Sequence, residues 1–86
     1  MSIEGKVAII TGASSGIGYA TALALSKAGV KVAIGARRTD KLEQLENEIK
    51  KNGGDVLSQK LDVTKKTDCD AIVDQTIKKW GTVDIL

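Results

Sequence analysis

Apolar and polar residues follow one another along this 86-residue chain in blocks that predict three strand–helix units. A continuous apolar run over residues 7–10 is typical of a strand buried on both faces. The run over 30–36 has Val30, Val32 and Ile34 on one face, and the run over 56–61 alternates imperfectly. After each run, apolar residues recur at helical spacing, which is typical of helices that bury one side. The pattern predicts strands over 7–10, 30–36 and 56–61, and helices over 16–28, from Thr39 to residue 51, and over 66–80.

Polar residues and glycines mark the expected ends of these helices. Thr39 is expected to cap the second helix, and glycines at 29, 53–54 and 81 follow the three helices as stop signals. The apolar residues of the first helix lie close to one stripe, formed by Ile17, Ala20, Ala24 and Ala28, with Leu23 beside it.

The alternation of strands and helices predicts parallel strands joined by right-handed crossovers. We therefore expect an α/β fold, the first half of a Rossmann-type doubly wound parallel sheet (βαβαβα), with strand order 3-2-1 and one domain over 1–86. Ser58, Gln59 and Lys60 make the third strand polar, which favours a place near the sheet edge. Residues 83–86 have the pattern of a fourth strand that begins beside the first.

A glycine-rich turn stands between the first strand and the first helix. Gly12, Gly16 and Gly18 have the spacing G-x-x-x-G-x-G. Such a turn presents backbone N–H groups and the positive end of a helix dipole, which attract a diphosphate when no Cβ blocks its approach. We expect Gly12 to allow the tight turn, Gly16 the approach of the phosphate, and Gly18 the close packing of the helix.

The diphosphate site predicted from this turn includes two serines that can add hydroxyl donors. Its candidate residues are Gly12, Ser14, Ser15, Gly16, Ile17 and Gly18. The alternative is a Gly/Ser-rich turn that binds no ligand. The strand before it and the helix after it favour the dinucleotide interpretation.

The segment after the second strand bears on which dinucleotide is preferred. An acidic residue there would accept hydrogen bonds from the ribose hydroxyls of NAD. This chain has Arg37 and Arg38 instead, and no acid at the strand tip. Guanidinium groups suit a 2′-phosphate, which Arg can bind with two parallel hydrogen bonds. The pair therefore favours NADP(H) over NAD(H), with a solvated basic turn as the alternative.

Asp62 and Val63 follow the third strand, near the place expected for the adenine ring. Asp62 can accept a hydrogen bond from the adenine amino group, and Val63 can pack on the ring. In the alternative interpretation, Asp62 or Thr64 caps the following helix. The two roles do not exclude each other.

Composition narrows the classes of function. With 42% hydrophobic and 28% charged residues, the chain is too apolar for a disordered tail. A net charge of +2 gives no support for a nucleic-acid partner. The absence of His and the single Cys69 exclude an internal disulfide, a cysteine zinc site and histidine catalysis. No apolar run is long enough for a membrane span or a leader, so we expect a cytoplasmic protein without a membrane partner or metal.

Together these motifs resemble the N-terminal part of a short-chain dehydrogenase/reductase. Residues 6–18 are similar to that family's opening strand and Thr-Gly-x-x-x-Gly-x-Gly turn, residues 61–64 to its third-strand end, and residues 80–86 to the approach to its fourth strand. The resemblance implies a nicotinamide dinucleotide cofactor, and the basic residue at the position of Arg37 implies NADP. It further implies a carbonyl or alcohol substrate for the complete protein, and it is compatible with a homo-oligomer.

The catalytic segments that the resemblance implies have no counterpart in these 86 residues. Missing are the family's Asn-Asn-Ala-Gly segment, its catalytic Ser and its Tyr-x-x-x-Lys pair, whose Tyr is the general acid/base. No catalytic residue is therefore assigned, and the chain alone is expected to be inactive.

Two main hypotheses about function follow. In the first, the chain is the cofactor-binding portion of an NADP-dependent oxidoreductase, truncated before the catalytic segment. In the second, it is a stand-alone, non-catalytic dinucleotide-binding half-domain, completed by a partner or by self-association. A third, a helical interaction module without nucleotide, requires the glycine turn to be accidental.

Overall fold

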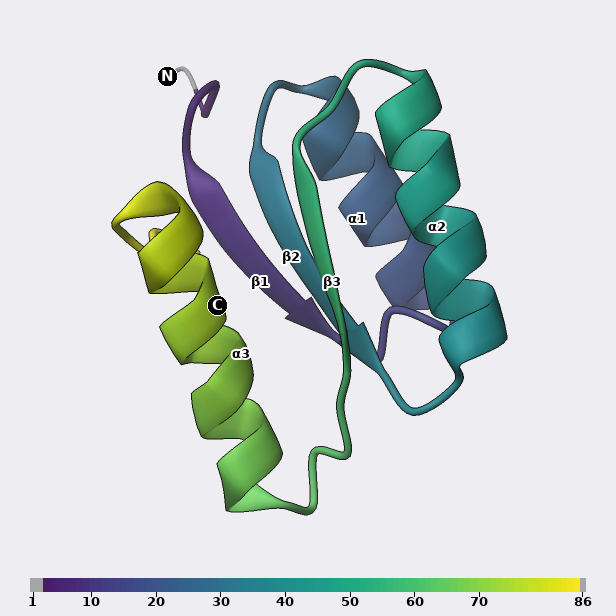
Figure 1. Cartoon of the computed structure of the whole chain (residues 1–86). Coiled ribbons are helices and arrows are strands. Elements are labelled where there is room, and N and C mark those ends of the chain that lie inside the picture. Colours follow the sequence, from purple (N-terminus) through teal and green to yellow (C-terminus); the bar gives the residue numbers. More distant parts are fainter. Residues whose placement is uncertain (1–2, 86) are drawn as a thin grey trace.

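Strands and helices alternate along the chain, as Figure 1 shows, in a computed structural model that describes residues 3–85. The elements are β1 (Val7–Thr11), α1 (Gly16–Lys27), β2 (Lys31–Ala36), α2 (Thr39–Lys51), β3 (Val56–Lys60) and α3 (Lys66–Trp80). All three predicted helices and the first three predicted strands are present, and their ends lie within one residue of those expected from the sequence. The predicted α/β class is confirmed.

The three strands form one parallel sheet in the order β1-β2-β3, which is the predicted order 3-2-1. The polar strand β3 lies at an edge, as expected. On the far side of β1, Ile85 forms a single parallel bridge with Ala8, at the place expected for the fourth strand, although residues 83–85 do not form a full strand. Leu86, at the end of that predicted strand, lies outside the described residues.

Helices cover both faces of the sheet: α1 and α2 lie on one face and α3 on the other (Figure 1). The middle strand β2 serves both layers, because successive side chains point to opposite faces. Val32 and Ile34 enter the core under α1 and α2, whereas Ala33 joins Leu61 and Ile72 under α3. Each fully buried large aliphatic side chain stabilises the fold by about 1.5–3 kcal/mol.

The apolar stripe identified in α1 faces away from the sheet. Ile17 is 84% exposed, and the three alanines of that stripe are exposed as well. Ala22 and Ser26 face the sheet instead, and their small side chains let the helix approach it closely. Because α1 is apolar on nearly every side, the spacing of its apolar residues does not determine which side is buried.

The cap predicted for α2 is also wrong. Thr39 is the first helical residue, and Arg38 is the N-cap, without a side-chain hydrogen bond to the helix. The acidic residue Asp40 in the first turn offsets the missing cap, because its negative charge stabilises the positive end of the helix dipole.

Candidate functional site

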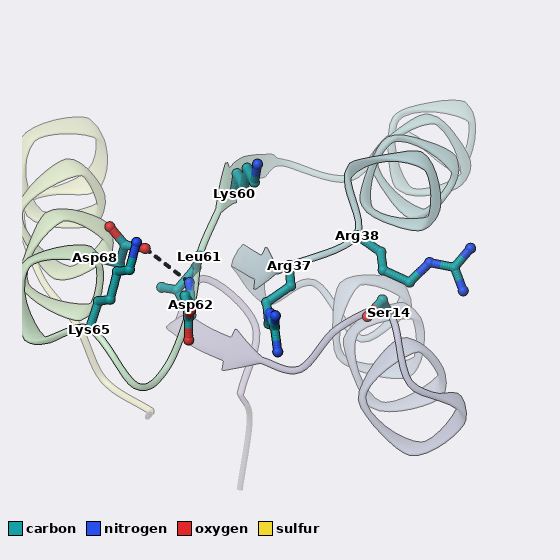
Figure 2. Close-up of a pocket in the computed structure, with 8 residues that line it drawn as sticks. All are labelled: Ser14, Arg37, Arg38, Lys60, Leu61, Asp62, Lys65 and Asp68. Atoms are coloured by element: carbon teal, nitrogen blue, oxygen red, sulfur yellow. Dashed lines mark hydrogen bonds between the residues drawn. The ribbon is translucent and has the colours of Figure 1, made fainter.

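A pocket opens at the carboxyl ends of the three strands, where open α/β sheets bind their ligands (Figure 2). It is lined by residues from the turn after β1, the ends of β2 and β3, and the start of α3. These lining residues are Ser14, Arg37, Arg38, Lys60, Leu61, Asp62, Lys65 and Asp68. We call it the strand-end pocket. It brings together one residue of the glycine turn, both arginines and Asp62, which are far apart in the sequence.

The glycine turn is closed by hydrogen bonds of its own. Gly12 has a φ of 65°, a conformation that favours glycine. The Ser15 hydroxyl donates to the Gly12 carbonyl oxygen at 2.8 Å and accepts from the Gly18 N–H at 3.3 Å, so Ser15 caps α1. Because the hydroxyl hydrogen of Ser15 is already donated within the turn, a phosphate contact from Ser15 requires that bond to be exchanged.

Gly16 and Gly18 differ in the space around them. A Cβ at Gly18 would overlap the Gly12 carbonyl oxygen and lie 3.2 Å from the Cα of Ala13. A Cβ at Gly16 would meet no atom within 4 Å. Gly18 is therefore required by the packing of the turn itself, whereas Gly16 leaves open space at the N-terminus of α1, where a diphosphate can approach.

The two arginine side chains diverge, as Figure 2 shows, although they are neighbours in sequence. Arg38 extends away from Arg37 and forms an ion pair with Asp40, its Nη2 lying 3.1 Å from Oδ2. Arg37 makes no ion pair within 4 Å among residues 3–85. Within the pocket, Arg37 is thus the arginine that a ligand can engage without displacing an acidic partner.

Asp62 is held from two sides at the end of β3. Its Oδ1 accepts hydrogen bonds from the Thr64 hydroxyl at 2.6 Å and from the Thr64 N–H at 3.0 Å, while its own N–H donates to Asp68 Oδ2 at 3.0 Å, the bond drawn in Figure 2. The bonds from Thr64 lower the pKa of Asp62, and the positive charges of Arg37 and Lys65 act in the same direction. Since both bonds end on Oδ1, Oδ2 can accept from a ligand.

The alternative role of Asp62 or Thr64 as a helix cap is wrong. The N-cap of α3 is Lys65, and no side chain caps this helix by a hydrogen bond. The Asp62–Thr64 bonds instead stabilise the turn that follows β3 and leave Val63 58% exposed at the surface.

Three charged residues of the pocket were not predicted from the sequence to belong to the site. Lys60 ends β3, and Lys65 and Asp68 belong to the start of α3. Lys60 reaches the pocket as the last residue of β3, and the packing of α3 against β1 and β2 places Lys65 and Asp68 beside it. Among residues 3–85, no cluster of three or more acidic or cysteine side chains can hold a metal ion, and no helix has the length and apolar character to cross a bilayer.

Comparisons with known proteins identify the family. Residues 6–86 match the family model described as short chain dehydrogenase. The chain belongs to the short-chain dehydrogenase family. An uncharacterized oxidoreductase of Listeria monocytogenes is 49% identical to it over 86 residues, which are 100% of this chain and 35% of that protein. Glycine betaine reductase of Emericella nidulans is 46% identical over 84 residues, 98% of this chain and 7% of that protein.

Solved structures of dehydrogenases share the fold. A hydroxysteroid dehydrogenase from Escherichia coli superposes with a TM-score of 0.91 at 34% identity, over 96% of this chain and 35% of that one. The glucose dehydrogenase of Caenorhabditis elegans gives a TM-score of 0.91 at 38% identity, over 99% of this chain and 38% of that one. The chain thus spans about a third of the length of the Listeria oxidoreductase and of both dehydrogenases, and 7% of the length of glycine betaine reductase. Short-chain dehydrogenases are oxidoreductases that bind a nicotinamide dinucleotide.

Proposed function

We propose that this chain is the NADP(H)-binding portion of a short-chain oxidoreductase, which transfers hydride between NADPH and a carbonyl or alcohol substrate. The observation that carries the proposal is the position of Arg37. It follows β2 directly and lines the strand-end pocket next to the glycine turn, and it forms no ion pair within 4 Å among residues 3–85. A guanidinium group there suits the 2′-phosphate that distinguishes NADP from NAD.

The order of the strands supports a dinucleotide laid across the carboxyl edge of the sheet. The turn after β1, from Gly12 to Gly18, would hold the diphosphate on backbone N–H groups at the N-terminus of α1. Arg37, after β2, would bind the ribose 2′-phosphate. Asp62 and Val63, after β3, would hold the adenine. The strands lie side by side in this same order, so the three parts of the proposed site would succeed one another along the sheet edge.

The charges of the pocket favour the phosphorylated cofactor. Arg37, Arg38, Lys60 and Lys65 are opposed by the carboxylates of Asp62 and Asp68, which leaves positive charge in excess. A 2′-phosphate carries roughly −1.5 to −2 charges at neutral pH, as phosphate esters do. Attraction to this pocket therefore adds to the binding of NADP(H), while an unphosphorylated ribose gains none of it.

The bound cofactor would supply or accept the hydride, and the residues of this chain would bind and orient it. No residue of the chain is assigned to catalysis, so we propose that the 86 residues alone bind the cofactor without turnover. A stand-alone, non-catalytic half-domain would bind it in the same way. The oxidoreductase portion and the stand-alone half-domain differ only in whether another protein segment, which carries a general acid/base, acts together with this site.

Arg37→Ala tests the proposed function. Loss of a charge-assisted hydrogen bond should weaken the binding of NADPH by about 1.5–3 kcal/mol, roughly tenfold to a hundredfold, and leave NADH binding nearly unchanged. Calorimetric titration of the 86-residue chain with each cofactor measures both constants. Lys51→Ala, which removes one positive charge in the last turn of α2, is the matched control and should change neither. Equal losses for both cofactors with Arg37→Ala would contradict the 2′-phosphate role.

A further inference from the structure

The ion pair between Arg38 and Asp40 stands at the strand-end pocket. Arg38 lines that pocket, and its guanidinium lies 3.1 Å from the carboxylate of Asp40, which is 65% exposed like Arg38 itself. Arg37, one residue earlier, has no such partner among residues 3–85. Of the two adjacent arginines of this pocket, Arg38 is therefore in an ion pair and Arg37 is not.

Asp40 keeps its negative charge and its place independently of Arg38. It lies in the first turn of α2, where the helix dipole stabilises an anion. A hydrogen bond from the Lys41 backbone N–H is the largest cause that lowers the pKa of Asp40, and the bond from Arg38 lowers it further. When Arg38 turns to another anion, Asp40 thus remains ionised beside it.

We infer that Asp40 is a specificity-determining residue that competes with the 2′-phosphate of the cofactor for Arg38 and so limits the preference for NADP(H). The inference rests on the proposed function, because it assumes that the phosphate enters this pocket. To bind the phosphate, Arg38 must break its ion pair with Asp40 or divide its hydrogen bonds between the two anions. The Asp40 carboxylate also repels the phosphate directly. Neither cost falls on an unphosphorylated ribose.

Exposure of the pair sets the size of the effect. Ion pairs in contact with water contribute little, and salt screens them further. Releasing Arg38 should therefore tighten the binding of a 2′-phosphate by about twofold to fivefold at low ionic strength. The gain should shrink as salt is added, because the Debye length shortens to about 8 Å at physiological ionic strength.

Asp40→Asn in the 86-residue chain tests the inference, because it removes the charge and keeps the size of the side chain. The probes are adenosine 2′,5′-bisphosphate and adenosine 5′-monophosphate, which differ by the 2′-phosphate alone, and then NADPH and NADH. We expect tighter binding of adenosine 2′,5′-bisphosphate and NADPH only. Unchanged affinity for both, or an equal gain for the unphosphorylated ligands, would overturn the inference.

Asp74→Asn is the matched control for the change of charge. Asp74 pairs with Lys78 on α3 at 3.2 Å and is 64% exposed, so its pair resembles that of Arg38 and Asp40 but lies outside the pocket. This variant should bind every probe like the parent chain. A gain equal to that of Asp40→Asn would assign the effect to net charge and would overturn the inference.

A double variant separates competition for Arg38 from plain repulsion. In a chain that carries Arg38→Ala, adding Asp40→Asn should give a clearly smaller gain for adenosine 2′,5′-bisphosphate, because only the direct repulsion is then relieved. A gain as large as in the presence of Arg38 would overturn the inference. The proposed function fails separately: it is contradicted if the parent chain binds adenosine 2′,5′-bisphosphate no better than adenosine 5′-monophosphate, whatever stands at position 40.

Discussion

At the scale of single residues, Gly16 and Gly18 are predicted to have opposite tasks. A Cβ at Gly18 overlaps the backbone of the turn, which cannot yield as a flexible side chain would, so Gly18→Ala should destabilise the fold by about 1–3 kcal/mol. A Cβ at Gly16 meets open space, so Gly16→Ala should leave stability near that of the parent chain and weaken NADPH binding. Urea unfolding and cofactor titration of both variants measure this difference, and equal stabilities would contradict it.

The residue types and their spacing were sufficient to predict that Ser14, Arg37 and Asp62 lie close together and line one pocket, because each follows a parallel strand at the same edge of the sheet. The pairing of Arg38 with Asp40 was not predictable in this way. Residues two apart do not face each other on a helix. The contact exists because Arg38 is the N-cap, outside the helical turn, and its side chain folds back onto the first turn.

At the scale of elements, the positions of the strands and helices could be predicted from the sequence, but the side of α1 that is buried could not. In α2 the apolar residues Leu42, Leu45 and Ile49 stand out against polar neighbours, and all three are buried. Helix α1 has little such contrast. Its orientation depends on which side chains are small enough to let it approach the sheet, and the periodicity of apolar residues does not contain that information.

The start of α3 and the end of β3 form one unit through Asp68, whose carboxylate accepts the Asp62 N–H. Asp68→Ala should remove that acceptor, lower stability by about 1 kcal/mol and speed exchange of the Asp62 amide. Asp68→Asn should retain most of the effect, because an amide oxygen also accepts. Asp70→Ala, a change at an exposed position on the same helix, is the control. If the alanine variants at 68 and 70 behave alike, the turn after β3 does not depend on Asp68.

At the scale of the whole molecule, the order of the strands could be predicted because right-handed crossovers leave few alternatives. The bridge between Ala8 and Ile85 lies where the pattern of residues 83–86 predicted the start of a fourth strand beside the first. The cytoplasmic location and the homo-oligomeric state stay predictions from the sequence. They depend on surroundings and partners, and the arrangement of these elements does not specify either.

The two ends of the described chain meet at the outer edge of β1. Asp84 Oδ2 accepts the Val7 N–H at 2.9 Å, and the N–H groups of Asp84 and Ile85 both donate to the Val7 carbonyl oxygen. The side chain of Asp84 thus satisfies a backbone donor at the point where the bridge between Ala8 and Ile85 has not yet begun. A strand edge without such partners exposes a row of unpaired donors and acceptors.

Asp84→Ala should therefore speed amide exchange at Val7 about tenfold, which corresponds to about 1.4 kcal/mol for the lost bond. Val32, whose N–H donates to the Asp55 carbonyl oxygen at 3.1 Å in the middle strand, is the internal reference and should keep its protection. Equal acceleration at both amides would mean that Asp84 stabilises the whole sheet. Unchanged exchange at Val7 would mean that the backbone bonds of Asp84 and Ile85 close this edge without the carboxylate.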